Sequence, residues 1–158
     1  QEEVASMARD LGFDVQILSP VPTTEMVDIY SALHVCDVMM GVHGAAMTHL
    51  LFMRPGTTFI QVVPLGTDWA AATYAMKLGL DYVQYNVSAL ESSLSNVYPL
   101  QHPVLANPNL VNAKGWSETK RIYLEGQDLT LSLPKLRSTL LATRSRIIKR
   151  SPPRSFVS

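Results

Sequence analysis

The sequence predicts an α/β fold, a Rossmann-like parallel sheet with helices on its faces, and three observations support it. Short apolar runs rich in β-branched residues alternate with segments of helical periodicity. The runs that end at residues 42 and 63 are nearly continuous, as is typical of strands buried on both faces of a parallel sheet. Each connection is long enough for a helix, and 158 residues that are 47% hydrophobic can bury one sizeable core.

The sequence pattern of the first part of the chain predicts a helix, a strand and a second helix. Apolar residues at helical spacing over 2–11 precede Gly12, a typical C-terminal cap. FDVQIL, residues 13–18, is β-rich and alternating, so we expect a strand that the prolines of SPVPTT end. The next helix is expected over 25–34.

The middle of the chain has the clearest alternation of strands and helices. Turn signals separate its elements, notably the Arg54-Pro55-Gly56 turn and the helix cap at Gly79. The expected elements are a strand over 37–42, a helix over 45–53, a strand over 58–63, a helix over 69–78 and a strand over 81–86.

The C-terminal part loses this alternation. Residues 88–118 are rich in Ser, Asn and Pro, which predicts a long surface loop. RIYLEG, residues 121–126, and DLTLSL, residues 128–133, are typical of a hairpin or two edge strands. A final amphipathic helix is expected from Pro134.

Charge and hydropathy exclude some partners. Thirteen basic and thirteen acidic residues balance, so no global field attracts the chain to nucleic acid. No apolar run reaches the roughly 18 residues that a bilayer span needs. The chain has no initiator methionine and opens in a helical pattern, so we expect a piece of a longer protein, with a domain over 1–150 and a disordered tail over 151–158.

The main candidate site is the turn within GVHGAAMTHLLFMRPGT, between a predicted strand and a predicted helix. Ligands of open parallel sheets bind at such turns. Gly41 and Gly44 are expected to allow positive φ and close approach of the backbone to an anion. Unpaired amides and the helix dipole favour an anion at the start of the helix, which comprises Ala45, Ala46, Met47 and Thr48.

His43 lies between the two glycines and would add a directional donor to a phosphate oxygen. A histidine that only caps the turn explains the pattern equally well. A nicotinamide cofactor fits poorly, because about 20 residues after the glycines, where an acidic ribose ligand is expected, the chain has the run FIQV over 59–62.

The block GVHGAAMTHLLFMRPGT, followed by IQVVPLGTDWAA and later by VNAKGW, resembles the plant glycosyltransferases of family 61. The similarity is greatest to the grass xylan arabinosyl- and xylosyltransferases and extends over about residues 2–148. One departure is Ala46, where many distant relatives read H-G-A-G, so the start of the helix is bulkier here.

The resemblance implies that the chain is the C-terminal, donor-binding half of a GT-B enzyme. It implies transfer of xylose or arabinose, with inversion, from a UDP-sugar to a xylan-type polysaccharide, without a metal or other cofactor. It also implies a type II membrane protein of the Golgi lumen, whose anchor and N-terminal domain lie outside this chain. His43 is then the candidate for stabilising the leaving UDP, while the base would come from the missing domain, so the chain alone should bind the donor without turnover.

Further candidates lie outside the turn. Asp68 could bind ribose or sugar hydroxyls and Trp69 could border the uracil or the sugar, although an N-capping aspartate beside a packed tryptophan is an alternative. Lys114 could neutralise diphosphate charge or be an ordinary surface lysine. Asn86 begins the glycosylation sequon Asn-Val-Ser. No His, Asp or Glu group has metal spacing, so no metal is expected.

Two other classes of protein remain compatible with the sequence. One is a non-catalytic, Rossmann-like module that binds a nucleotide or phosphate. The other is a fragment of a secretory protein that only mediates assembly. Binding of UDP would exclude the fragment that only mediates assembly. Activity of the longer protein would separate a glycosyltransferase from a non-catalytic binding module.

Overall fold

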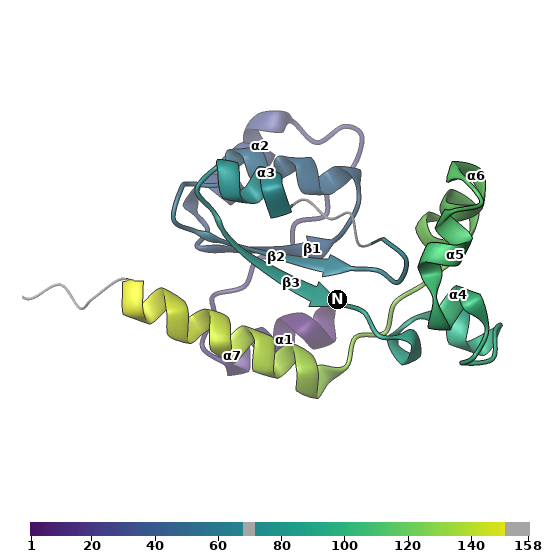
Figure 1. Cartoon of the computed structure of the whole chain (residues 1–158). Coiled ribbons are helices and arrows are strands. Elements are labelled where there is room, and N and C mark those ends of the chain that lie inside the picture. The colour runs from purple at the N-terminus through teal and green to yellow at the C-terminus, as the bar shows by residue number, and fades with distance from the viewer. Residues whose placement is uncertain (68–71, 151–158) are drawn as a thin grey trace, which may run out of the picture. The chain divides into compact units, whose positions relative to one another are not determined.

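The structure is a computed structural model that describes residues 1–67 and 72–150 (Figure 1). The described residues form two compact units. Thr23–Leu131 is a contiguous unit that contains the sheet, and Gln1–Pro22 combines with the C-terminal helix into a second unit. The tail predicted over 151–158 lies outside the described residues.

The contiguous unit contains a parallel three-stranded sheet in the order β1-β2-β3. Its strands are β1 (Val38–Val42), β2 (Thr58–Val63) and β3 (Asp81–Asn86), and every residue of the central β2 is buried. The expected α/β class and three of the four expected strands are confirmed. The strand expected over 13–18 is wrong: that segment pairs with no strand, since alternation is a local signal and pairing needs a neighbour.

Three helical segments accompany the sheet: the first precedes β1, and the other two lie in the connections between successive strands. They are α2 (Met26–Val35), η1 (Ala45–Phe52) and α3 (Ala72–Lys77), and Figure 1 shows α2 and α3 on the same side. When parallel strands follow one another in sequence, crossovers of a single hand place the connecting helices on the same side of the sheet. The helix expected over 45–53 is present as a 3₁₀-helix, in which the Thr48 hydroxyl donates to the Ala45 carbonyl at 2.8 Å.

Glycines end the elements as expected. Gly79, with φ +71°, follows α3, and the next amide, that of Leu80, donates back to the Ala75 carbonyl at 3.0 Å. Gly56, with φ +85°, occupies the turn after Arg54, in which the Thr57 amide donates to the Arg54 carbonyl at 3.2 Å.

Residues 88–131, which we call the helical region, correct two expectations. The loop expected over 88–118 is folded largely into short helices. In place of the hairpin or two edge strands expected over 121–126 and 128–133, the structure has a π-helix followed by an isolated bridge between Ser92 and Leu129. The apolar side chains in this region form their own core, which comprises Leu94, Val104, Leu105, Val111, Ile122 and Tyr123. Its helices are η2 (Ala89–Glu91), η3 (Ser93–Asn96), α4 (Pro103–Ala106), α5 (Pro108–Asn112), α6 (Trp116–Thr119) and η4 (Lys120–Leu124).

The second unit joins two segments that are far apart in sequence. Helix α1 (Glu2–Asp10) contacts α7 (Leu133–Arg150), which confirms the expected first and last helices. Gly12 has φ +84° and follows α1 as expected. No helix in the described part of the chain combines the length and apolar character of a membrane span.

Candidate functional site

The turn after β1 places His43 beside the central strand. The His43 amide donates to the Val62 carbonyl at 2.8 Å, so the β1–β2 ladder continues one residue beyond the end of β1. Side chains alternate between the faces of a sheet, so His43 shares a face with Gly41 and with the register partner of Gly41, Gln61. The imidazole is partly buried at this position.

Gln61 is the centre of a series of hydrogen bonds that links the turn after β1 with β2 and β3. Its side chain is 0% exposed, and its Nε2 lies 2.9 Å from His43 Nδ1. Its Oε1 accepts from the Tyr82 hydroxyl of β3 at 2.9 Å. An amide nitrogen only donates, so in this arrangement Nδ1 is an acceptor and the proton of the neutral imidazole is on Nε2.

Burial governs the ionisation of both titratable groups in this chain of hydrogen bonds. It lowers the pKa of His43 from its usual value, because the imidazolium is desolvated, and it raises the pKa of Tyr82 for the corresponding reason. Both side chains are therefore neutral near pH 7. His43 is a neutral hydrogen-bond donor unless a nearby anion stabilises its charged form.

Two backbone amides of the turn are available to an anion. Gly44, Ala45 and Ala46 are exposed, and within the described part of the chain the amides of Ala45 and Ala46 have no hydrogen-bond acceptor. The Met47 amide, which we expected to take part, donates instead to the Gly44 carbonyl at 3.0 Å. Exposed Thr48 completes the turn, with its hydroxyl donating to Ala45.

The expected role of the two glycines is corrected. Neither Gly41 nor Gly44 adopts the left-handed conformation, and Gly44 is extended with φ 167°. Gly41 leaves room for the thioether end of Met47, which would have to move if a Cβ were added there. At Gly44 the nearest atom to an added Cβ, the Val42 carbonyl oxygen, is 4.0 Å away, so a small side chain fits there.

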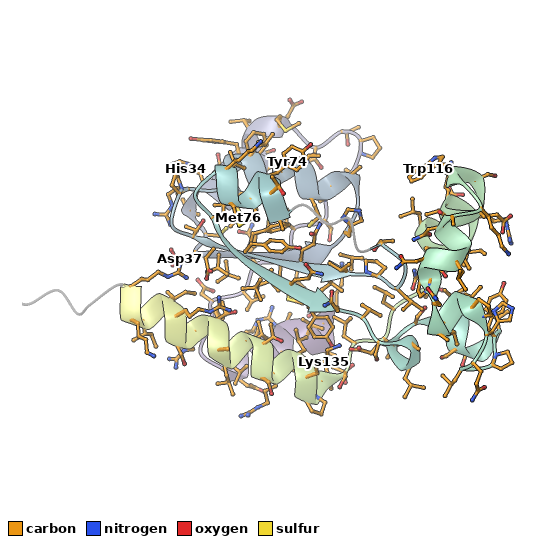
Figure 2. All side chains as sticks on the ribbon, viewed as in Figure 1. His34, Asp37, Tyr74, Met76, Trp116 and Lys135 are labelled. Carbon is orange, nitrogen blue, oxygen red and sulfur yellow. The ribbon has the colours of Figure 1, made fainter. Side chains whose placement is uncertain are left out.

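Hydrogen bonds attach the helical region to the loop that follows β2. Asn112 Nδ2 donates to the Gly66 carbonyl at 3.1 Å, and Gln127 Nε2 donates to the Leu65 carbonyl at 2.9 Å. The carboxyl ends of parallel strands meet at one edge of a sheet, so the segment VNAKGW lies at the edge where the His43 turn begins. In that segment Lys114 is exposed, as is Trp116 on α6 (Figure 2).

The structure does not join every predicted residue to the turn. No hydrogen bond or ion pair connects Lys114 with the turn in the described residues, and Asp68 and Trp69 lie outside them. Asn86 is exposed at the end of β3, and its Oδ1 accepts from Gln84 Nε2 at 2.6 Å. Among described residues, no group of three or more His, Cys, Asp or Glu could hold a metal, and metal independence remains a prediction.

Sequence analysis does not identify Gln61 and Tyr82 as site residues. A signal existed for Gln61, because it is the only amide in the apolar run FIQVV and a buried amide needs partners. Tyr82 carries no such signal. Its contact with Gln61 depends on the register between β2 and β3, which sets Phe59 opposite Tyr82 and Gln61 opposite Gln84.

Comparison with known proteins adds the following matches. The profile of the family Glycosyltransferase 61 matches residues 1–60. The xylan glycosyltransferase MUCI21 of Arabidopsis thaliana is 47% identical over 153 residues, which cover 94% of this chain and 31% of the relative. Two relatives from Oryza sativa subsp. japonica each match 89% of the chain. The alpha-1,3-arabinosyltransferase XAT3 is 34% identical over 145 residues, 25% of its length, and the beta-1,2-xylosyltransferase XYXT1 is 36% identical over 148 residues, 31% of its length.

These relatives and the matching family are all glycosyltransferases, which is the class of enzyme that the sequence predicts. The predicted resemblance of the chain to glycosyltransferase family 61 is thereby confirmed. The chain spans about a quarter to a third of the length of the curated relatives that it matches. No solved structure matches it significantly.

Proposed function

We propose that the chain is the donor-binding half of a GT-B glycosyltransferase, which transfers xylose or arabinose from a UDP-sugar to a xylan-type polysaccharide with inversion. The observation that carries the proposal is the turn after β1, where the unbonded amides of Ala45 and Ala46 adjoin the imidazole of His43 at the carboxyl edge of the sheet. The relatives, which are named as xylan, arabinosyl- and xylosyltransferases, support the pentose and the acceptor.

The turn suits a diphosphate leaving group. As the bond from the sugar to UDP breaks, negative charge grows on the β-phosphate, and donors already directed at it lower the barrier. Ala45 and Ala46 would supply two backbone N–H groups, and His43 would add the Nε2–H. Lys114 would contribute positive charge from the helical region. A base to deprotonate the acceptor hydroxyl would come from the N-terminal domain of the intact enzyme.

We place the intact enzyme in the Golgi lumen, as a type II membrane protein with its anchor outside this chain. The exposed position of Asn86 at the end of β3 supports luminal residence, because a sequon asparagine must be accessible to carry a glycan. Asp68 and Trp69 remain candidates for contacts with the ribose, the sugar or the uracil.

Calorimetric titration of the 158-residue chain with nucleotides tests this function. We expect UDP, UDP-xylose and UDP-arabinofuranose to bind, and UDP-N-acetylglucosamine to bind more weakly than the pentose donors. Product analysis of the longer protein with a xylan oligosaccharide then separates an enzyme from a non-catalytic nucleotide-binding module. Absence of UDP binding by a folded chain would refute both.

Transfer by the intact enzyme is expected to survive removal of divalent metal ions. The sequence contains no Asp-x-Asp pair, with which many transferases hold a metal on the diphosphate, and the donors of this turn are amides and an imidazole. Initial rates with and without excess EDTA should agree, while a manganese-dependent transferase assayed in parallel loses activity. A rate that falls to background and returns with manganese would contradict the metal-free mechanism.

A further inference from the structure

We propose that Gln61 is a positioning residue which, with Tyr82 behind it, holds His43 in the tautomer that presents Nε2–H to the donor diphosphate. This inference rests on the proposed function of the turn. It assigns a role to two residues that would not touch the ligand and act only through the imidazole.

Gln61 is constrained at both ends of its amide. Its side chain is fully buried in the central strand, where water cannot replace a missing partner. Nε2 meets His43 Nδ1 and Oε1 meets the Tyr82 hydroxyl, each at 2.9 Å. A rotation of this amide about its last torsion would exchange donor and acceptor at both contacts at once.

The Tyr82 hydroxyl determines which way the amide is oriented. Its single proton can go to Gln61 Oε1 at 2.9 Å or to Gln84 Oε1 at 3.3 Å. The shorter contact orients Gln61 with Nε2 toward the imidazole, so His43 Nδ1 accepts. In the reverse order Tyr82 donates to Gln84, Gln61 turns its Oε1 toward His43, and the imidazole must carry a proton on Nδ1.

The two orders have opposite consequences for a phosphate ligand. With Nδ1 as an acceptor, neutral His43 carries its proton on Nε2, on the other edge of the ring, and donates to a phosphate oxygen. With the proton on Nδ1, neutral His43 has a lone pair on Nε2, which repels that oxygen. The buried hydrogen bonds of Gln61 and Tyr82 therefore control whether the neutral imidazole attracts or repels the diphosphate of the UDP-sugar. Residues behind metal-binding histidines have the same role.

The imidazole nitrogens of His43 report this role directly. In ¹⁵N-labelled wild-type chain without ligand, we expect the spectrum of an imidazole protonated on Nε2. Gln61→Met keeps the volume but removes the amide, and Tyr82→Phe removes the hydroxyl. Each should give a mixture of tautomers, whereas Gln61→Glu should move the proton to Nδ1 because a carboxylate accepts it.

Gln84→Met is the matched control, because Gln84 is an exposed glutamine of β3 that contacts Tyr82 but not His43. It should leave the His43 spectrum unchanged, since Tyr82 donates to Gln61. Wild-type nitrogen shifts in both Gln61→Met and Tyr82→Phe would overturn the inference. A change in the His43 nitrogen shifts as large in Gln84→Met as in Tyr82→Phe would also overturn it. Tyr82 would then donate to Gln84 and not to Gln61.

UDP titration of the same variants links the tautomer to binding. Gln61→Met and Tyr82→Phe should raise the Kd for UDP about 3- to 10-fold, because the competent imidazole becomes a fraction of the population, and Gln84→Met should not. Wild-type affinity in both variants would refute a positioning role. If the wild-type chain fails to bind UDP, the proposed function is refuted, and so is a role of the His43 tautomer in binding. The spectra would still show whether Gln61 and Tyr82 set that tautomer.

Discussion

Replacing Gly66 with alanine is expected to destabilise the contiguous unit by roughly 2 to 5 kcal/mol. Gly66 has φ +77°, and a Cβ there would lie between 2.5 and 2.6 Å from three ring atoms of Tyr123. Tyr123 cannot yield easily, because it is 1% exposed and its hydroxyl donates to the Val104 carbonyl at 2.8 Å. Urea denaturation of the full chain, followed by circular dichroism, measures the loss.

Gly56→Ala is the matched control for this substitution. Gly56 has a similar φ of +85°, but an added Cβ meets no atom within 4 Å, so only the backbone strain remains, about 1 to 2 kcal/mol. Equal destabilisation by the two substitutions would show that Tyr123 does not confine Gly66. A clearly larger loss at Gly66 confirms that the loop after β2 is closed against the core of the helical region.

Removing the imidazole by His43→Ala should weaken UDP binding by roughly 1 to 3 kcal/mol, which is about 5- to 160-fold in Kd. The loss is that of a hydrogen bond to a charged phosphate oxygen, and the exposed amides of Ala45 and Ala46 account for the binding that remains. Isothermal titration calorimetry of the folded variant with UDP provides the measurement.

His49→Ala makes the same change on η1, six residues further along the chain. The ring of His49 stacks on Phe52 with a centroid distance of 6.0 Å and takes no part in the turn. UDP should therefore bind this variant as it binds the wild type. If His43→Ala also binds UDP with wild-type affinity while remaining folded, His43 only caps the turn.

The features of the fold that local chemistry determines could be predicted. Nearly continuous apolar runs identify β1 and β2, the alternating segment DYVQYN identifies β3, and glycines identify the ends of α1 and α3. The segment over 13–18 has the pattern of a strand without a partner, because pairing is a property of the whole sheet. The helical region was missed for a related reason. Its helices are only a few residues long, too short to show a helical periodicity, and packing among their apolar side chains stabilises them.

The candidate site was predictable only in part. The strand-to-turn junction and the exposure of Ala45 and Ala46 follow from the sequence of small residues after His43. The partners of His43 do not, because Gln61 reaches it through strand register and Tyr82 reaches it only through Gln61. The glycine conformations were wrong for another reason: sequence shows that a positive φ is allowed, not that it is adopted.

The contact between α1 and α7 has a consequence for the order in which the chain folds. The two helices flank Thr23–Leu131, so bringing them together in an unfolded chain closes a loop at an entropic cost on the order of 4 kcal/mol. The contiguous unit has no comparable cost, since its parallel strands follow one another in sequence. Once that unit has formed, it replaces the flexible loop with a compact connection. We therefore expect the sheet to form first, and the pair of terminal helices to form last and to open first.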